Sequence, residues 1–147
     1  MRQEEYMNVL SDYLGQYQRA KRRKERLEKR LIDISWEINK KENKQRATGI
    51  AFRAQECQER ICEQICEETV DLLKIMDIFD YLERNSTERN ALEIHYIDGV
   101  GWERVAEEVN VSRSHIYNIR TAALKKLIEY KRVRDILNKY MGREKEE

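Results

Sequence analysis

The fold is decided by residues 88–127, which have the sequence ERNALEIHYIDGVGWERVAEEVNVSRSHIYNIRTAALKKL. Residues 98–101, DGVG, predict a turn after a first helix. The next residues, 102–109, carry the one-sided apolar stripe of a short second helix. Asn110 and Val111 predict a tight turn, and Ser112 is a favourable N-cap for a third helix. Two helices joined by so short a turn, the second capped and basic, are typical of a helix-turn-helix.

The third helix has an apolar side and an opposite polar side when each residue advances by 100°. The apolar side, expected in the core, contains Ile116, Ile119, Ala123, Leu124 and Leu127. The polar side contains Ser114, Tyr117, Asn118, Thr121 and Lys125, with Arg113 and His115 flanking it in the first turn. Arginine and asparagine are residue types that bond guanine and adenine edges in the major groove. We therefore expect residues 112–130 to bind double-stranded DNA through these seven side chains, with phosphates held by Lys126, Lys131 and Arg132.

Residues 99–127, GVGWERVAEEVNVSRSHIYNIRTAALKKL, resemble the fourth conserved region of sigma-70-type factors, whose helix-turn-helix binds the −35 promoter element. The resemblance places Arg113, Ser114, Tyr117 and Asn118 at the base-reading positions of that family. Ser114 stands where the family commonly has glutamate, and Tyr117 where it commonly has arginine, so the −35 sequence preference does not carry over. Nothing in the chain resembles the sigma region that melts the −10 element, which argues against a complete sigma factor.

The whole chain, a charged helical half followed by this motif, resembles the late-gene transcriptional regulators of phages and prophages of Gram-positive bacteria, of the RinA and ArpU type. That resemblance implies a transcription activator of phage or mobile-element genes, with double-stranded DNA and RNA polymerase as partners. Two alternatives are a sigma-like RNA polymerase adaptor and a helical assembly protein such as a small terminase subunit.

A homodimer is expected on DNA, because one short recognition helix contacts too few base pairs to find a promoter. The apolar and aromatic side chains that could supply self-association are Tyr6, Leu10 and Tyr13 near the start of the chain, and Tyr130, Ile136, Leu137 and Tyr140 near its end.

The N-terminal half predicts two long helices, and the absence of proline favours an all-α fold. Apolar residues spaced by three and four run from Tyr6 through Leu10, Tyr13 and Tyr17 to Ile38, and a second such seam runs from Ile61 to Leu82. Residues 19–46 contain 12 basic and 5 acidic side chains, a net +7, whereas residues 54–83 contain 2 basic and 9 acidic, a net −7. Opposite charge favours a long, coiled-coil-like antiparallel hairpin, whereas a parallel coiled-coil dimer is the alternative.

In the hairpin, the chain reverses near Thr48, with a break at Gly49 after the polar run KKENKQRATG. Facing residue numbers then add up to about 96, which pairs Leu31 with Ile65. The basic run from Arg19 to Arg30 then either pairs with the acidic second helix or makes a second nucleic-acid contact. The second helix is expected to end near Arg84, which makes residues 1–85 a helical arm and residues 86–147 the DNA-binding domain.

Several classes of protein are disfavoured by what the sequence contains. No apolar stretch approaches the length of a membrane span and the N-terminus lacks a secretion signal, so a cytoplasmic protein without a membrane partner is expected. Cys57, Cys62 and Cys66 form no CxxC pair, so we expect no metal and no cofactor, with Cys62 and Cys66 buried. Trp102 is expected in the core and His95 on a helix surface. No phosphate loop or nucleophile–histidine spacing is present, which argues against an enzyme.

Overall fold

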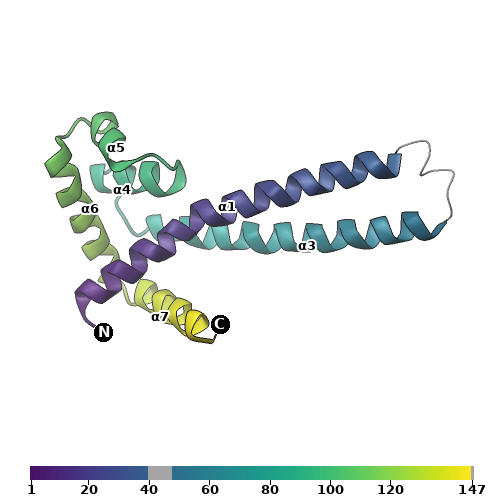
Figure 1. Ribbon diagram of the computed structural model, residues 1–147. Coiled ribbons are helices and arrows are strands. Elements are labelled where there is room, and N and C mark those ends of the chain that lie inside the picture. Colours follow the sequence, from purple (N-terminus) through teal and green to yellow (C-terminus); the bar gives the residue numbers. More distant parts are fainter. Residues whose placement is uncertain (40–47, 147) are drawn as a thin grey trace. The chain divides into compact units, whose positions relative to one another are not determined.

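The computed structural model describes the backbone of residues 1–146 except 40–47, and the side chains of residues 1–37 and 52–142. Its elements are α1 (Gln3–Asn39), α3 (Thr48–Phe79), α4 (Thr87–Leu92), the π-helical turn η1 (Glu93–Ile97), α5 (Trp102–Glu108), α6 (Arg113–Ile128) and α7 (Lys131–Glu146) (Figure 1). The described residues form helices and no strand, which confirms the all-α fold class.

The chain divides into two compact units, which we call the head unit and the arm unit. Residues 1–18 and 73–147 form the head unit, and Arg19–Leu72 form the arm unit. The boundary predicted after residue 85 therefore lies inside the head unit. The reason is packing, because Leu10 and Leu14 of α1 are fully buried in the same apolar cluster as Phe79 of α3.

The core of the head unit consists of two apolar clusters that meet around α6. One contains Leu10, Leu14, Phe79, Leu124, Leu127 and Leu137 among its buried members. The other contains Ala91, Val105, Ala106, Ile116 and Ile119. The five residues predicted for the inner side of α6 are all buried, as expected. Burying one such large side chain contributes about 1.5–3 kcal/mol, so these contacts fix which side of α6 faces outward.

The side chains expected to mediate self-association are largely used within the head unit. Leu10 and Leu137 are fully buried, and the rings of Tyr13 and Tyr140 lie in edge contact with centroids 5.2 Å apart. The Oη atom of Tyr6 donates to Oδ1 of Asn138. The prediction that these residues form a dimer surface is therefore wrong for Leu10 and Leu137, because both ends of the chain pack into one core.

In the arm unit, the described segments of α1 and α3 run antiparallel. Nε of Arg23 donates to Oε1 of Glu68 at 2.9 Å, and Nε2 of Gln58 donates to Oγ of Ser35 at 3.2 Å. Facing residue numbers thus add up to 91 and 93, about one helical turn away from the predicted 96. A seam of alternating three and four spacings repeats along the helix, so apolar spacing alone does not distinguish registers one turn apart.

The end of α3 also differs from the prediction. The helix ends at Phe79, five residues before Arg84, and the amides of the next three residues bond to carbonyls three positions earlier. Asn85 then adopts a left-handed conformation with φ of 64°, and Ser86 caps α4 by accepting from the amide of Arg89. At its other end α3 already begins at Thr48, before the break predicted at Gly49. The polar run expected to hold the reversal, residues 40–47, lies outside the described residues.

Candidate nucleic-acid interface

The turn between α5 and α6 has the geometry that the sequence predicts. Asn110 is left-handed, with φ of 58°, a conformation that asparagine adopts more readily than most residues. The amide of Val111 donates to the carbonyl of Ala106 at 2.9 Å. Ser112 is extended, and its Oγ accepts from the amide of His115 at 3.1 Å, which caps α6. Both the tight turn and the cap are confirmed.

The rotation of α6 about its axis is fixed from its inner side. Val111 before the cap and Ile116 after it pack in the same cluster, which is the arrangement of a hydrophobic staple. Val105 of α5 and Ile116 of α6 are fully buried there. The staple and the core set the direction in which α6 leaves the turn. The opposite side of α6, which we call the outward row, therefore faces away from the core and contains Ser114, Tyr117, Asn118, Thr121 and Lys125, flanked by Arg113 and His115.

The outward row contains most of the predicted base-reading side chains. Arg113, Ser114, His115, Asn118 and Lys125 are exposed, and Tyr117 retains 50% of its accessible surface. Thr121 differs, because it is half-buried and its Oγ1 donates to the carbonyl of Tyr117 at 2.9 Å. The hydroxyl hydrogen of Thr121 is therefore already bonded, while Ser114, Tyr117 and Asn118 lie free of the core in the first two turns.

Arg113 makes a weak contact with the neighbouring helix. Its Nη1 lies 3.7 Å from Oε1 of Glu103, and the side chains of both residues are more than two-thirds exposed. An ion pair this open contributes only about 0–1 kcal/mol. The guanidinium of Arg113 thus remains available to a ligand at the start of α6.

The three residues expected to hold phosphates, and Lys125 beside them, have different environments. Nζ of Lys126 donates to Oε2 of Glu88 in α4 at 2.6 Å, and this bond raises the pKa of Lys126. Its charge is thus compensated on the flank of α6, whereas Lys125 is exposed on the outward row. Lys131 and Arg132 are exposed in the first turn of α7. Among these described side chains, Lys126 is therefore the one whose charge is already paired.

A group of stacked side chains behind α6 was not predicted. The ring of His95 stacks on Trp102, with centroids 3.9 Å apart and planes inclined by 19°. The guanidinium of Arg120 lies over Trp102 at 5.7 Å from the ring centroid, and its Nη2 donates to Oγ of Ser11 at 3.2 Å. Trp102 is partly buried against both apolar clusters. Arg120 of α6 is thereby tied to α1 and α5.

His95 is half-buried, so the prediction of a surface histidine is wrong. Nδ1 of His95 lies 2.7 Å from the carbonyl oxygen of Val100. Burial lowers the pKa of His95, the bond to Val100 opposes this effect, and the charge of Arg120 lowers the pKa further. The π-helical turn explains the error, because the amide of Asp98 bonds to the carbonyl of Glu93, five residues back. The wider turn alters which residues face the core, and no regular helical spacing reveals it.

Three further observations concern the described part of the chain as a whole. Cys62 and Cys66 are exposed on α3, so their predicted burial is wrong, while Cys57 is half-buried. Among the described residues there is no cluster of three or more potential metal ligands. None of the helices described is both long enough and apolar enough to span a bilayer.

Comparison with known proteins finds no matching family model, no similar curated protein and no similar solved structure.

Proposed function

We propose that the protein is a sequence-specific transcription regulator that binds double-stranded DNA with α6 in the major groove. The observation that carries this proposal is the outward row of α6, where Ser114, Tyr117 and Asn118 are exposed in the first two turns of a capped helix. In a helix-turn-helix, the N-terminal residues of the second helix contact base edges. The buried inner side of α6 supports the same orientation, since it leaves this row as the surface that a groove can accept.

The side chains have distinct roles in this proposal. Arg113 bonds guanine, Asn118 bonds adenine, and Ser114 and Tyr117 contact neighbouring base edges, with His115 and Thr121 at the margin of the row. Exposed Lys125, Lys131 and Arg132 hold phosphates, which fixes the position of α6 without reading sequence.

The biological setting belongs to the same proposal. The resemblance of residues 99–127 to the fourth region of sigma factors, and of the whole chain to late-gene regulators, supports a cytoplasmic activator of phage or mobile-element genes rather than an enzyme. RNA polymerase is then the second partner, reached once the protein is bound upstream of a promoter.

The test begins with selection of duplexes from a random pool by the full chain. A selected duplex and a scrambled duplex are then titrated with wild type and with Arg113→Ala and Asn118→Ala. Each substitution is expected to weaken binding to the selected duplex by about 1–3 kcal/mol, or roughly 5- to 150-fold. Binding to the scrambled duplex should change little, because phosphate contacts remain.

Matched controls come from exposed residues of the same types elsewhere in the head unit. Arg84→Ala removes an arginine between α3 and α4, and Asn8→Ala removes an asparagine from α1. Neither control substitution should change the ratio of the affinities for the selected and the scrambled duplex. Equal losses on both duplexes for Arg113→Ala and Asn118→Ala would contradict base reading, and a pool without enrichment would contradict sequence specificity.

A further inference from the structure

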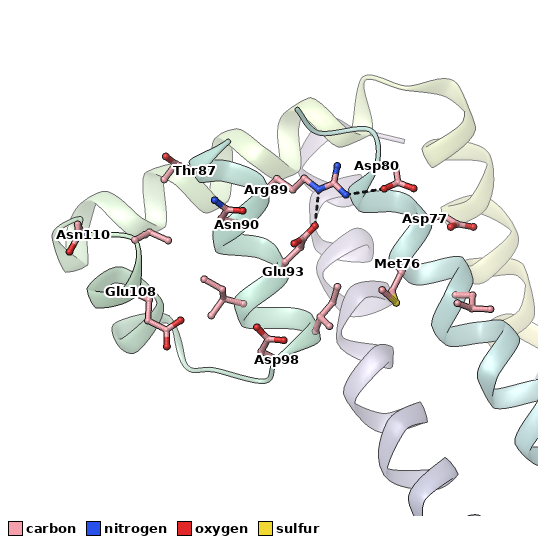
Figure 2. Close-up of a pocket in the computed structure, with 14 residues that line it drawn as sticks. Met76, Asp77, Asp80, Thr87, Arg89, Asn90, Glu93, Asp98, Glu108 and Asn110 are labelled. Carbon is pink, nitrogen blue, oxygen red and sulfur yellow. Dashed lines mark hydrogen bonds and ion pairs between the residues drawn. The ribbon is translucent and has the colours of Figure 1, made fainter. Parts of the chain in front are cut away.

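The head unit has an open groove of about 620 Å³ between the end of α3, the α4–η1 segment and the end of α5 (Figure 2). Its apolar lining contains Leu73, Met76, Ile94, Ile97 and Val109. Leu73 is 54% exposed and Met76 is 41% exposed. Large apolar side chains left open in a groove are typical of a binding surface.

The rim of the groove is acidic. It contains Asp77, Asp80, Glu93, Asp98 and Glu108. Arg89 is the one basic residue among the described lining residues, and its guanidinium bonds Asp80 at 2.9 Å and Glu93 at 2.7 Å (Figure 2). Asp77, Asp98 and Glu108 therefore keep charges that Arg89 does not compensate. A rim of this charge repels DNA phosphates and favours a basic partner.

The arm unit carries a surface that combines exposed apolar side chains with basic ones. Ile32 is 57% exposed and Trp36 is 70% exposed on α1. Arg22 and Lys29 are also exposed, and the spacings from Arg22 to Lys29, Ile32 and Trp36 are seven, three and four residues. Those spacings place the four residues on one face of a helix. Acidic Glu25 lies within this face, and acidic Glu28 and Asp33 lie at its margins. The face combines apolar anchors at one end with basic side chains on the preceding turns.

We infer that the Arg22–Trp36 face of α1 in one copy docks into the acidic groove of a second copy. Ile32 and Trp36 then cover the apolar floor at Leu73 and Met76, while the basic side chains meet the acidic rim. This is the helix-in-groove mode of recognition, with charge complementarity fixing the partner. Two copies that dock reciprocally form a closed dimer with two identical contacts.

The inference goes beyond the proposed function, since it needs no DNA. It also supplies a self-association surface in place of Leu10 and Leu137, which are buried in the head unit.

The first test measures the mass of the full chain by sedimentation velocity over a hundredfold range of concentration, without DNA. A dimer is expected, and Met76→Gln or Trp36→Gln should each raise its dissociation constant about tenfold or more, since both remove apolar contact without changing charge. The matched control is Phe52→Gln, which replaces an exposed aromatic side chain of α3 that lies outside both proposed surfaces; Phe52 is 63% exposed. A protein that stays monomeric, or a dimer that neither variant weakens, overturns the inference.

A charge exchange tests the pairing itself. The groove variant combines Asp98→Lys with Glu108→Lys, at positions where helices end and lysine is well tolerated. The arm variant combines Arg22→Glu with Lys29→Glu. Each variant alone is expected to be monomeric at concentrations where wild type is dimeric.

The four changes together in one chain should restore the dimer, because the charges are exchanged. Mixing the two variants should also restore a dimer, because one contact then joins a wild-type groove to a wild-type arm face and the other pairs the exchanged charges. Failure of the exchanged chain to dimerise, while circular dichroism shows it folded, overturns the pairing. The control Asp135→Lys changes an exposed acidic residue of α7 outside the groove and should leave the dimer unaffected.

Discussion

Neighbouring lysines on α6 are expected to contribute very differently to DNA binding. Lys125 is exposed on the outward row, whereas Lys126 is bonded to Glu88 at 2.6 Å. Each phosphate neutralised on B-DNA contributes about 0.9 to the slope of log K against log salt. Lys125→Gln should therefore reduce that slope by about 0.9, which between 50 and 200 mM salt amounts to roughly a threefold smaller loss of affinity. Lys126→Gln should change the slope much less, because its charge is already compensated.

The assay is fluorescence anisotropy of a selected duplex at four salt concentrations, with both variants and wild type measured in parallel. Glu88→Gln is a useful companion, since it releases Lys126 and is expected to steepen the slope. If Lys126→Gln reduces the slope as much as Lys125→Gln does, the assignment of phosphate contacts from the outward row of α6 is incorrect.

Three further predictions concern the cap of α6, the half-buried His95 and the thiols of α3. Ser112→Ala should lower the free energy of unfolding by about 1 kcal/mol in urea titrations, whereas Ser112→Asn should retain the cap. Folding lowers the pKa of His95 below its ordinary 6.5, so the stability that neutral His95 contributes is complete above about pH 6.5 and is lost as the pH falls. The free energy of unfolding should therefore be lower at pH 5.5 than at pH 7.5. This decrease should be smaller in His95→Gln than in the control His115→Gln. Cys62 and Cys66 should react rapidly with a thiol reagent in the folded protein, and slow reaction of both would contradict their exposure.

The parts of the site that could be predicted from sequence depend on local chemistry. Ser112 caps α6 and Asn110 makes the turn because of their own side chains and neighbouring amides. The inner side of α6 follows from a regular 3.6-residue period, and all five predicted residues are buried. The exposure of Tyr117 and Asn118 follows from the same period, so this part of the candidate interface can be predicted without knowledge of long-range packing.

The parts that could not be predicted depend on contacts between distant segments. Leu14 is fully buried although it falls outside the expected seam of α1, because it packs in a cluster that also contains Phe79. Lys126 meets Glu88 across 38 positions of sequence. The stack of His95 on Trp102 depends on a π-helical turn and on the left-handed turn that follows it at Gly99.

The exposure of two cysteines and the register of the hairpin also differ from the prediction. Free cysteine is usually buried, yet Cys62 and Cys66 lie on the open side of α3. The predicted hairpin register differs from the observed one by about one helical turn, because the apolar spacing fits more than one alignment. The ion pair of Arg23 with Glu68 distinguishes these alignments, but the sequence offers many other charged residues that could pair. Both the exposure of these cysteines and the register depend on how whole helices pack rather than on any one residue.

The central claim is that the outward row of α6 contacts DNA bases, and a photocrosslink from that row tests it most directly. A benzoylphenylalanine in place of Tyr117, which is 50% exposed, is irradiated with a selected duplex, and the same group in place of Phe52, which is 63% exposed, is the control. We predict a covalent adduct with the duplex from position 117 and none from position 52. An adduct from position 52 without one from position 117 would contradict the account.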